Sequence, residues 1–231
     1  MCKCNKGVIL NISSIVIFVD IYHKVSRYNI RMCVSSFPSF SRFPKGKTHL
    51  VVIDPGVGTS RRRIAIKGKP YLYVGPDNGL LPSAAKAERI EKIVEISNYR
   101  FIITSTSTIF EGRKIFAFVE ANFLKGLPIE DLCPEIHVLV EPLLIEPEVN
   151  GDRIIGFVVH NDWFGNLITN LSKGLLDKLR IIECVLFDVN LGGVLKMIRF
   201  CRAYGEVPDN YPIVIIGSSG FLEVSINPGS I

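Results

Sequence analysis

The feature that most constrains the fold is a short apolar run that ends at an acidic turn. Residues 49–53 read His-Leu-Val-Val-Ile, which is typical of a buried strand, and Asp54-Pro55-Gly56 ends the run. Open α/β sheets bind their ligands at the carboxyl ends of the strands. We therefore expect the Asp54 carboxylate to lie at the ligand-binding edge of such a sheet.

Strands and helices alternate up to about residue 147, which indicates an α/β layer structure. Two strands and two helices are predicted there, at residues 64–67, 71–74, 80–89 and 108–123 in chain order. The apolar pieces 8–12 and 15–19 suit buried strands or a short helix–strand step. We expect an α/β domain with a mixed or parallel sheet over residues 1–147.

The pattern changes after residue 147 to short strands separated by glycine turns. Strands are predicted at residues 153–160, 167–169, 181–189, 211–216 and 221–226. Many short strands in succession are typical of a small β-barrel or sandwich. The second domain, residues 148–231, is expected to be all-β and barrel-like.

Composition argues against a membrane protein and against a nucleic-acid-binding protein. The longest early apolar stretch, residues 8–19, contains polar residues and is too short to span a bilayer. The net charge is only +5, and the single basic cluster, residues 61–63, has no interleaved aromatics that would stack on bases. None of the six cysteines has Cys-x-x-Cys spacing, so we expect free thiols, no metal site and a cytoplasmic location.

Arg61 follows Asp54 closely enough for the two side chains to meet. Two glycines lie between them, so the chain can fold back and bring the guanidinium to the carboxylate. Such a pair is suited to holding and polarising a water molecule. Two alternatives stay open: residues 54–59 form only a structural turn, and the arginines at 61–63 simply face solvent.

Two segments of the second domain carry groups suited to a planar heterocycle. Residues 161–166 read Asn-Asp-Trp-Phe-Gly-Asn, so aromatic faces and amide groups surround a glycine. Residues 217–223 read as a glycine-serine turn that leads into a strand, where Glu223 is placed to read the edge of a nucleobase. The alternative for both segments is an ordinary turn.

Five motifs in a fixed order carry a resemblance to a known family. They are VIDPGVGT at residues 52–59, VGPDNGLL at 74–81, FEGR at 110–113, DWFGNLITN at 162–170 and SSGFLE at 218–223. Together they resemble the S-adenosylmethionine hydroxide adenosyltransferase family, whose relatives include the fluorinases and chlorinases. The similarity covers residues 6–231.

The resemblance implies a reaction and an assembly. Water or hydroxide attacks the 5′ carbon of S-adenosylmethionine and releases adenosine and L-methionine, without a metal or a separate cofactor. Such a hydrolase is a homotrimer, with the substrate between the N-terminal domain of one subunit and the C-terminal domain of its neighbour. Because the sulfonium is an excellent leaving group, the main task is to position the water and the ribose.

The resemblance also implies site residues. The family handles the water with an Asp–Arg–His set; Asp54 and Arg61 match the first two, and Glu111 stands in the place of the histidine. Asp54 is expected to bind substrate as well, whereas Asp77 and Asn78 are expected to be structural. The other implied binding residues are Phe164 and Asn166 for the adenine or sugar, and Ser218, Glu223 and Ile226 for the adenine edge.

Glu111 leaves two hypotheses open. It acts as a general base for the water, or it forms a salt bridge with Arg61 and silences the site. A carboxylate at this place would repel a halide, which disfavours a halide-using enzyme. The second candidate function is therefore a catalytically impaired protein that binds adenosine or S-adenosylmethionine.

The start of the chain departs from the family pattern. The family opens with a strand that ends in Thr-Thr-Asp-Phe-Gly and whose aspartate holds the ribose hydroxyls. Residues 1–9 match the helix after that strand. We expect either a start further upstream or the loss of this strand.

Overall fold

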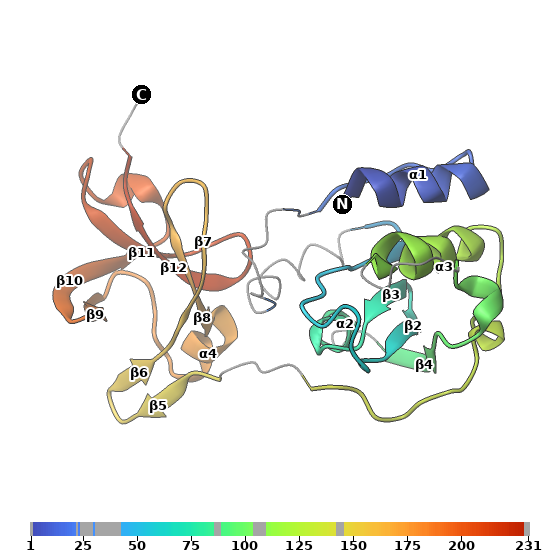
Figure 1. Ribbon diagram of the computed structural model, residues 1–231. Coiled ribbons are helices and arrows are strands. Elements are labelled where there is room, and N and C mark those ends of the chain that lie inside the picture. Colours follow the sequence, from blue (N-terminus) through green and yellow to red (C-terminus); the bar gives the residue numbers. More distant parts are fainter. Residues whose placement is uncertain are drawn as a thin grey trace. The chain divides into compact units, whose positions relative to one another are not determined.

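The computed structural model describes most of the chain, in two compact units (Figure 1). The residues that it describes are 2–21, 23, 30, 43–85, 89–103, 110–141 and 146–228. The units are Met1–Leu143 and Leu144–Ile231, called the N-terminal and C-terminal units below. The sequence pattern predicts the division a little later, after residue 147.

A four-stranded mixed sheet forms the centre of the N-terminal unit (Figure 1). Its strands are β1 (Thr48–Leu50), β2 (Arg63–Lys69), β3 (Leu72–Pro76) and β4 (Arg89–Glu95). They lie in the order β1-β3-β2-β4, with β1 parallel to β3 and β2 antiparallel to both of its neighbours. The expected α/β organisation with a mixed sheet is confirmed for this unit.

Short helices accompany the sheet. They are α1 (Cys2–Ile12), α2 (Leu80–Ala85), η2 (Tyr99–Phe101), the π-helical turn η3 (Gly112–Phe116), α3 (Ala117–Phe123) and η4 (Ile129–Leu132). The turn η3 continues directly into α3. Helix α1 packs on α3, where Ile9 contacts Ala117 and Ala121.

Apolar clusters cover both faces of the sheet. Because side chains alternate along a strand, Ala65 belongs to one cluster while Ile64 and Ile66 belong to the other. The first cluster includes Phe116 and Val119 from η3 and α3. The second includes Leu81, Ala84 and Ala85 of α2. The sheet is therefore covered on both sides, and its loops are left to carry polar groups.

The C-terminal unit contains a six-stranded sheet in the order β7-β8-β12-β11-β10-β9 (Figure 1). The strands are β7 (Val158–Asn161), β8 (Leu167–Ser172), β9 (Leu186–Leu191), β10 (Val194–Cys201), β11 (Pro212–Ile216) and β12 (Phe221–Ile226). Strands β10 and β11 pair in parallel, and the other neighbours are antiparallel. The remaining elements are the hairpin β5 (Glu148–Asn150) and β6 (Arg153–Ile155), helix α4 (Lys173–Lys178) and the turn η5 (Tyr204–Glu206).

Several predicted elements need correction. The helix predicted at 80–89 ends at Ala85, and Arg89 begins β4, because this segment pairs with β2; residues 86–88 lie outside the described part of the chain. The helix predicted at 108–123 is described only from residue 110 onward, where η3 and α3 account for it. The apolar piece 8–12 is helical, within α1.

The C-terminal unit is mainly β, but the expectation of an all-β unit is wrong in one respect, because α4 packs Leu176 into the core. The strand predicted at 153–160 is interrupted at Gly156. A Cβ atom there would lie 2.8 Å from side-chain atoms of Asn170 and Leu171. The strand predicted at 181–189 begins only at Leu186.

No helix among the residues that the structure describes is long and apolar enough to cross a bilayer.

Candidate active site

Asp54 follows the carboxyl end of β1, as predicted, although the strand ends at Leu50 and not at Ile53. The backbone N–H of Val51 still donates to the carbonyl of Val74, at 3.0 Å, so β1 and β3 stay paired beyond Leu50. Asn78, in the loop after β3, donates from Nδ2 to the carbonyl of Ile53 at 2.7 Å. The loops after these two parallel strands are therefore tied together at one edge of the sheet.

The loop from Asp54 to Arg61 folds back on itself. Gly58 adopts φ +82°, a left-handed conformation that residues with a side chain rarely take. The Thr59 hydroxyl donates to the carbonyl of Gly56 at 2.7 Å and fixes the turn. Arg61 Nε then donates to Asp54 Oδ1 at 2.8 Å, and its Nη2 donates to Oδ2. The expected approach of Arg61 to Asp54 is confirmed.

Glu111, the residue that directly precedes η3, also contacts this pair. Its Oε2 accepts a hydrogen bond from Arg61 Nη2. Its Oε1 accepts two hydrogen bonds from Arg63, from Nε at 3.0 Å and from Nη2 at 2.6 Å. We call Asp54, Arg61, Arg63 and Glu111 the carboxylate–arginine cluster.

Arg63 was not predicted from the sequence, although a signal for it exists. Alternate side chains of an extended segment point to the same side, so Arg61 and Arg63 share a side and Arg62 points to the other. Arg62 contacts the buried Asp77 carboxylate at 2.6 Å and the carbonyl of Val138 at 2.6 Å. The alternative that the three arginines simply face solvent is therefore wrong.

Three of the four side chains in the cluster are buried, and the cluster carries no net formal charge. The side chains of Asp54, Arg61 and Glu111 are only 6%, 10% and 6% exposed, and Arg63 is 33% exposed. Burial alone would raise the pKa of Glu111, but the hydrogen bonds from Arg63 and Arg61 outweigh it and lower this pKa. Burial alone would lower the pKa of Arg61, and its bonds to Asp54 and Glu111 raise it instead. Both groups are thus held in their charged forms.

Asp77 and Asn78 make structural contacts. Besides its ion pair with Arg62, Asp77 accepts a hydrogen bond from the backbone N–H of Val140 at 3.0 Å. Asn78 Oδ1 accepts from the N–H of Leu80 at 3.3 Å, at the start of α2. These contacts anchor the loop beside the cluster.

In the C-terminal unit, Asp162 organises the loop between β7 and β8. Its Oδ1 accepts from the N–H groups of Phe164 at 2.8 Å and Asn166 at 2.9 Å. Its Oδ2 accepts from Asn166 Nδ2 at 2.9 Å. The Phe164 side chain is left projecting, and the residue is 91% exposed. The loop therefore displays an aromatic ring on a fixed backbone.

Glu223 is a buried carboxyl group on β12, opposite Ile168 of β8. Burial raises its pKa, and the negative charge of Asp162 raises it further. The Glu223 side chain also lies over Gly217, where an added Cβ atom would be 1.6 Å from Oε1. Only glycine at position 217 leaves room for this arrangement.

The strand register separates the other predicted binding residues. Leu167 pairs with Val224, so the loop that carries Phe164 and Asn166 lies toward the Ile226 end of β12. Ser218 lies in the turn between β11 and β12, toward the opposite end. Five steps of roughly 3.3 Å separate the two ends of β12. The structure thus groups Phe164, Asn166 and Ile226 at one end, and the binding roles of these three residues, of Ser218 and of Glu223 stay predictions.

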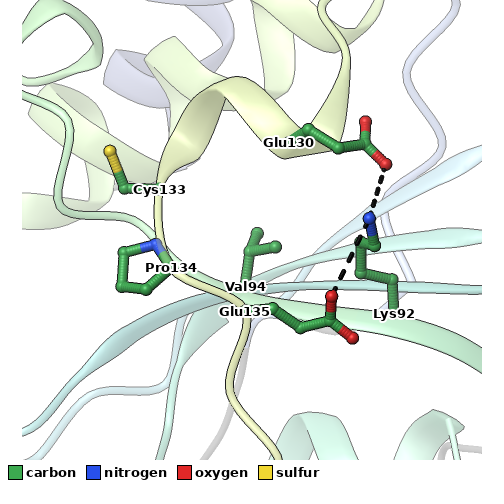
Figure 2. A pocket seen from close by; sticks show the side chains of 6 residues that line it. All are labelled: Lys92, Val94, Glu130, Cys133, Pro134 and Glu135. Atoms are coloured by element: carbon green, nitrogen blue, oxygen red, sulfur yellow. Dashed lines mark hydrogen bonds and ion pairs between the residues drawn. The ribbon is translucent and has the colours of Figure 1, made fainter.

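The N-terminal unit also has a surface hollow of about 450 Å³ that no residue of the cluster lines (Figure 2). It is lined by Lys92, Val94, Glu130, Cys133, Pro134 and Glu135. Lys92 Nζ lies 2.9 Å from a carboxylate oxygen of Glu130 and 3.9 Å from one of Glu135. None of the predicted site residues lines this hollow.

The fold and the cluster define a class of two-unit protein with an Asp–Arg pair at the edge of its α/β sheet. Residues 3–133 match the model of the SAM hydroxide adenosyltransferase N-terminal domain, and residues 156–231 match that of the C-terminal domain. The chain belongs to the SAM hydroxide adenosyltransferase family.

Named relatives and solved structures agree with this assignment. The (R)-S-adenosyl-L-methionine hydrolase of Thermus thermophilus is 34% identical over 92% of this chain and 81% of its own length. A fluorinase of an Actinoplanes species is 25% identical over 96% of this chain and 85% of its own. An uncharacterized conserved protein from Thermotoga maritima, 33% identical, superimposes with a TM-score of 0.89 over 99% of this chain and 88% of that structure.

Proposed function

We propose that this protein hydrolyses S-adenosylmethionine to adenosine and L-methionine. The observation that carries the proposal is the buried Arg61 guanidinium, which is held between the carboxylates of Asp54 and Glu111 at the edge of the sheet. Membership of the family and the similarity to the Thermus thermophilus hydrolase support the choice of substrate.

The chemistry needs little more than a positioned water molecule. The C5′–O bond forms while the C5′–S bond breaks, and the electron pair of that bond stays on sulfur, which becomes the neutral thioether of methionine. The protonated alcohol formed in this step is a far stronger acid than any carboxylic acid. A carboxylate of lowered pKa, such as Glu111, is therefore still basic enough to accept the proton. This route needs no metal and no further cofactor.

A second candidate is a protein that binds S-adenosylmethionine without turning it over. The lowered pKa of Glu111 favours it, because a weaker base assists proton removal less. The two carboxylates also occupy much of the hydrogen-bonding capacity of Arg61.

We also propose a cytoplasmic homotrimer in which the C-terminal sheet curls into the family's barrel. Each site would combine the cluster of one copy with the Phe164 loop of the next. The exposure of the neighbouring Trp163 and Phe164, 74% and 91%, supports this proposal, because large aromatic surfaces are common at binding interfaces.

The test is product analysis after incubation with S-adenosylmethionine. We expect the wild type to release adenosine and methionine in equal amounts, and Arg61→Ala to be slower by roughly 10²–10³-fold. Lys67→Ala, which removes one charge from an exposed position of β2, serves as the matched control and should keep its activity. A rise in Tm with S-adenosylmethionine but no product would establish the binding protein instead. Neither product nor a rise in Tm would exclude both.

A further inference from the structure

We propose that Arg63 is the positioning residue that makes Glu111 usable in the reaction, because it holds one carboxylate oxygen away from Arg61. This inference rests on the proposed function. Arg63 donates to Oε1 of Glu111 from two nitrogen atoms, Nε at 3.0 Å and Nη2 at 2.6 Å. Arg61 contacts only the other oxygen, Oε2. The two arginines therefore divide the carboxylate between them.

The division matters because Arg61 has few donors to spare. A guanidinium has five N–H groups. In Arg61, Nε bonds to Asp54, Nη2 bonds to Asp54 and Glu111, and Nη1 makes one long bond to the carbonyl of Arg62 at 3.4 Å. Within the described part of the chain, one N–H of Nη1 has no acceptor, so it can hold a water molecule.

Without Arg63, Glu111 would compete for that donor. A carboxylate with both oxygens free prefers to pair with a guanidinium through two parallel hydrogen bonds. Glu111 Oε1 would then turn to Arg61 Nη1 and displace the water. Arg63 prevents this turn, so it separates an active arrangement from the silenced one in which Glu111 only neutralises Arg61.

Arg63 also balances the charge around Glu111. The charged groups that face Glu111 are Arg61 and Arg63, while Asp54 acts through Arg61. From α1, the neutral side chain of Asn5 lies against Gly112. If Arg63 were removed, two buried carboxylates would share one guanidinium, and Glu111 would take up a proton at a higher pH.

The kinetic test compares three substitutions on β2. We expect Arg63→Ala to lower kcat roughly tenfold or more, to change KM much less, and to move the acidic limb of the kcat–pH profile to higher pH. Arg63→Lys keeps the charge but cannot donate to Oε1 from two nitrogen atoms, so it should restore the acidic limb and only part of kcat. Lys67→Ala should change neither. An Arg63→Ala enzyme with unaltered kcat and pH profile would overturn the inference.

A double-mutant cycle separates positioning from a merely structural role. In a Glu111→His background there is no carboxylate to hold, so Arg63→Ala should cause no further loss of kcat. Equal losses in both backgrounds would mean that Arg63 does not act through Glu111. Thermal unfolding of each variant shows whether a loss of kcat reflects loss of the fold.

A measurement without turnover distinguishes failure of this inference from failure of the proposed function. Titration of the ¹³C-labelled Glu111 carboxyl group by NMR should give a higher pKa in Arg63→Ala than in the wild type. If the wild type releases no adenosine but this shift occurs, the hydrolase proposal fails and the hold of Arg63 on Glu111 stands. An unchanged pKa would refute the hold itself.

Discussion

Glu120, on α3, is a buried carboxyl group outside the proposed site. It is 6% exposed, and its Oε2 has no hydrogen-bond partner among the described residues. Burial raises its pKa from the ordinary 4.5 to about 8. The folded protein therefore keeps Glu120 protonated at pH 7, whereas the unfolded chain ionises it. The contribution of Glu120 to the free energy of unfolding is therefore fully present below about pH 4.5 and is lost as the pH rises toward 8. The loss is at most about 1.4 kcal/mol per pH unit.

Substituting Glu120 should remove this loss. We expect Glu120→Gln to unfold at nearly the wild-type denaturant concentration at pH 5 but to be the more stable protein at pH 8. Denaturant unfolding across this range measures the difference. The exposed Glu135, changed to Gln, is the control and should follow the wild type. If Glu120→Gln shows the same pH slope as the wild type, the carboxyl group is not kept neutral in the folded protein.

The residues of the site differ in how far the sequence predicts them. Asp54 and Arg61 are predictable because a strand end and a glycine-containing loop restrict where their side chains can go. Glu111 is distant in sequence, and only the order of the family motifs brings it to the same site. Alternation along an extended segment puts Arg63 on the same side as Arg61. It predicts a role for Arg63 in the site only once Glu111 is known to lie on that same side.

At the scale of elements, the β11–β12 turn is shaped around one side chain. Gly217 is the last residue before the turn, and the Glu223 carboxyl group occupies the space that a Cβ atom would need. Since this carboxyl group is the end of a flexible side chain, it would move before the backbone does. A substitution at Gly217 therefore changes where Glu223 lies more than it changes the fold.

Gly217→Ala tests whether that placement matters for binding. If Glu223 bonds to the adenine edge, loss of one hydrogen bond of about 1 kcal/mol raises KM for S-adenosylmethionine roughly fivefold. Gly205→Ala is the matched control, since a Cβ atom there meets nothing within 4 Å. KM values from steady-state adenosine release give the comparison. An unchanged KM for Gly217→Ala would remove Glu223 from the set of binding residues.

Elements were predictable where the pattern is local. Strand β12 has the predicted bounds, Phe221–Ile226, because glycine turns and an apolar run delimit it. The sequence does not predict strand β10, because its first four residues are all exposed and show no alternation of buried and exposed side chains. Its pairing with β9 and β11 is not visible in the sequence either. Helix α1 was ambiguous because short apolar runs suit a helix and a strand alike.

At the scale of the whole molecule, the predicted substrate contacts fall in both units. The carboxylate–arginine cluster belongs to the N-terminal unit, and Phe164 belongs to the C-terminal unit. The sequence predicts two units from a change of pattern. No local pattern specifies whether the two units that form one site come from the same chain or from two chains, because this depends on how the chains assemble.

Mixing two inactive variants tests the proposed trimer. Arg61→Ala and Phe164→Ala, each nearly inactive at substrate concentrations below KM, should complement each other when they are co-expressed. If each site combines units of two copies, random assembly leaves about a quarter of the sites intact. Adenosine release measures the recovery, and sedimentation gives the oligomeric state. No recovery would place each site within a single copy.

The electroneutrality of the carboxylate–arginine cluster has a consequence for how substrate arrives. The two carboxylates and two guanidiniums carry no net charge, so the cluster does not attract a sulfonium cation from a distance. Salt screens the remaining field, since the Debye length is about 10 Å at 0.1 M. The chain as a whole carries +5, which repels a cation weakly. Encounter is therefore governed by diffusion and shape, and the association rate should vary little with ionic strength.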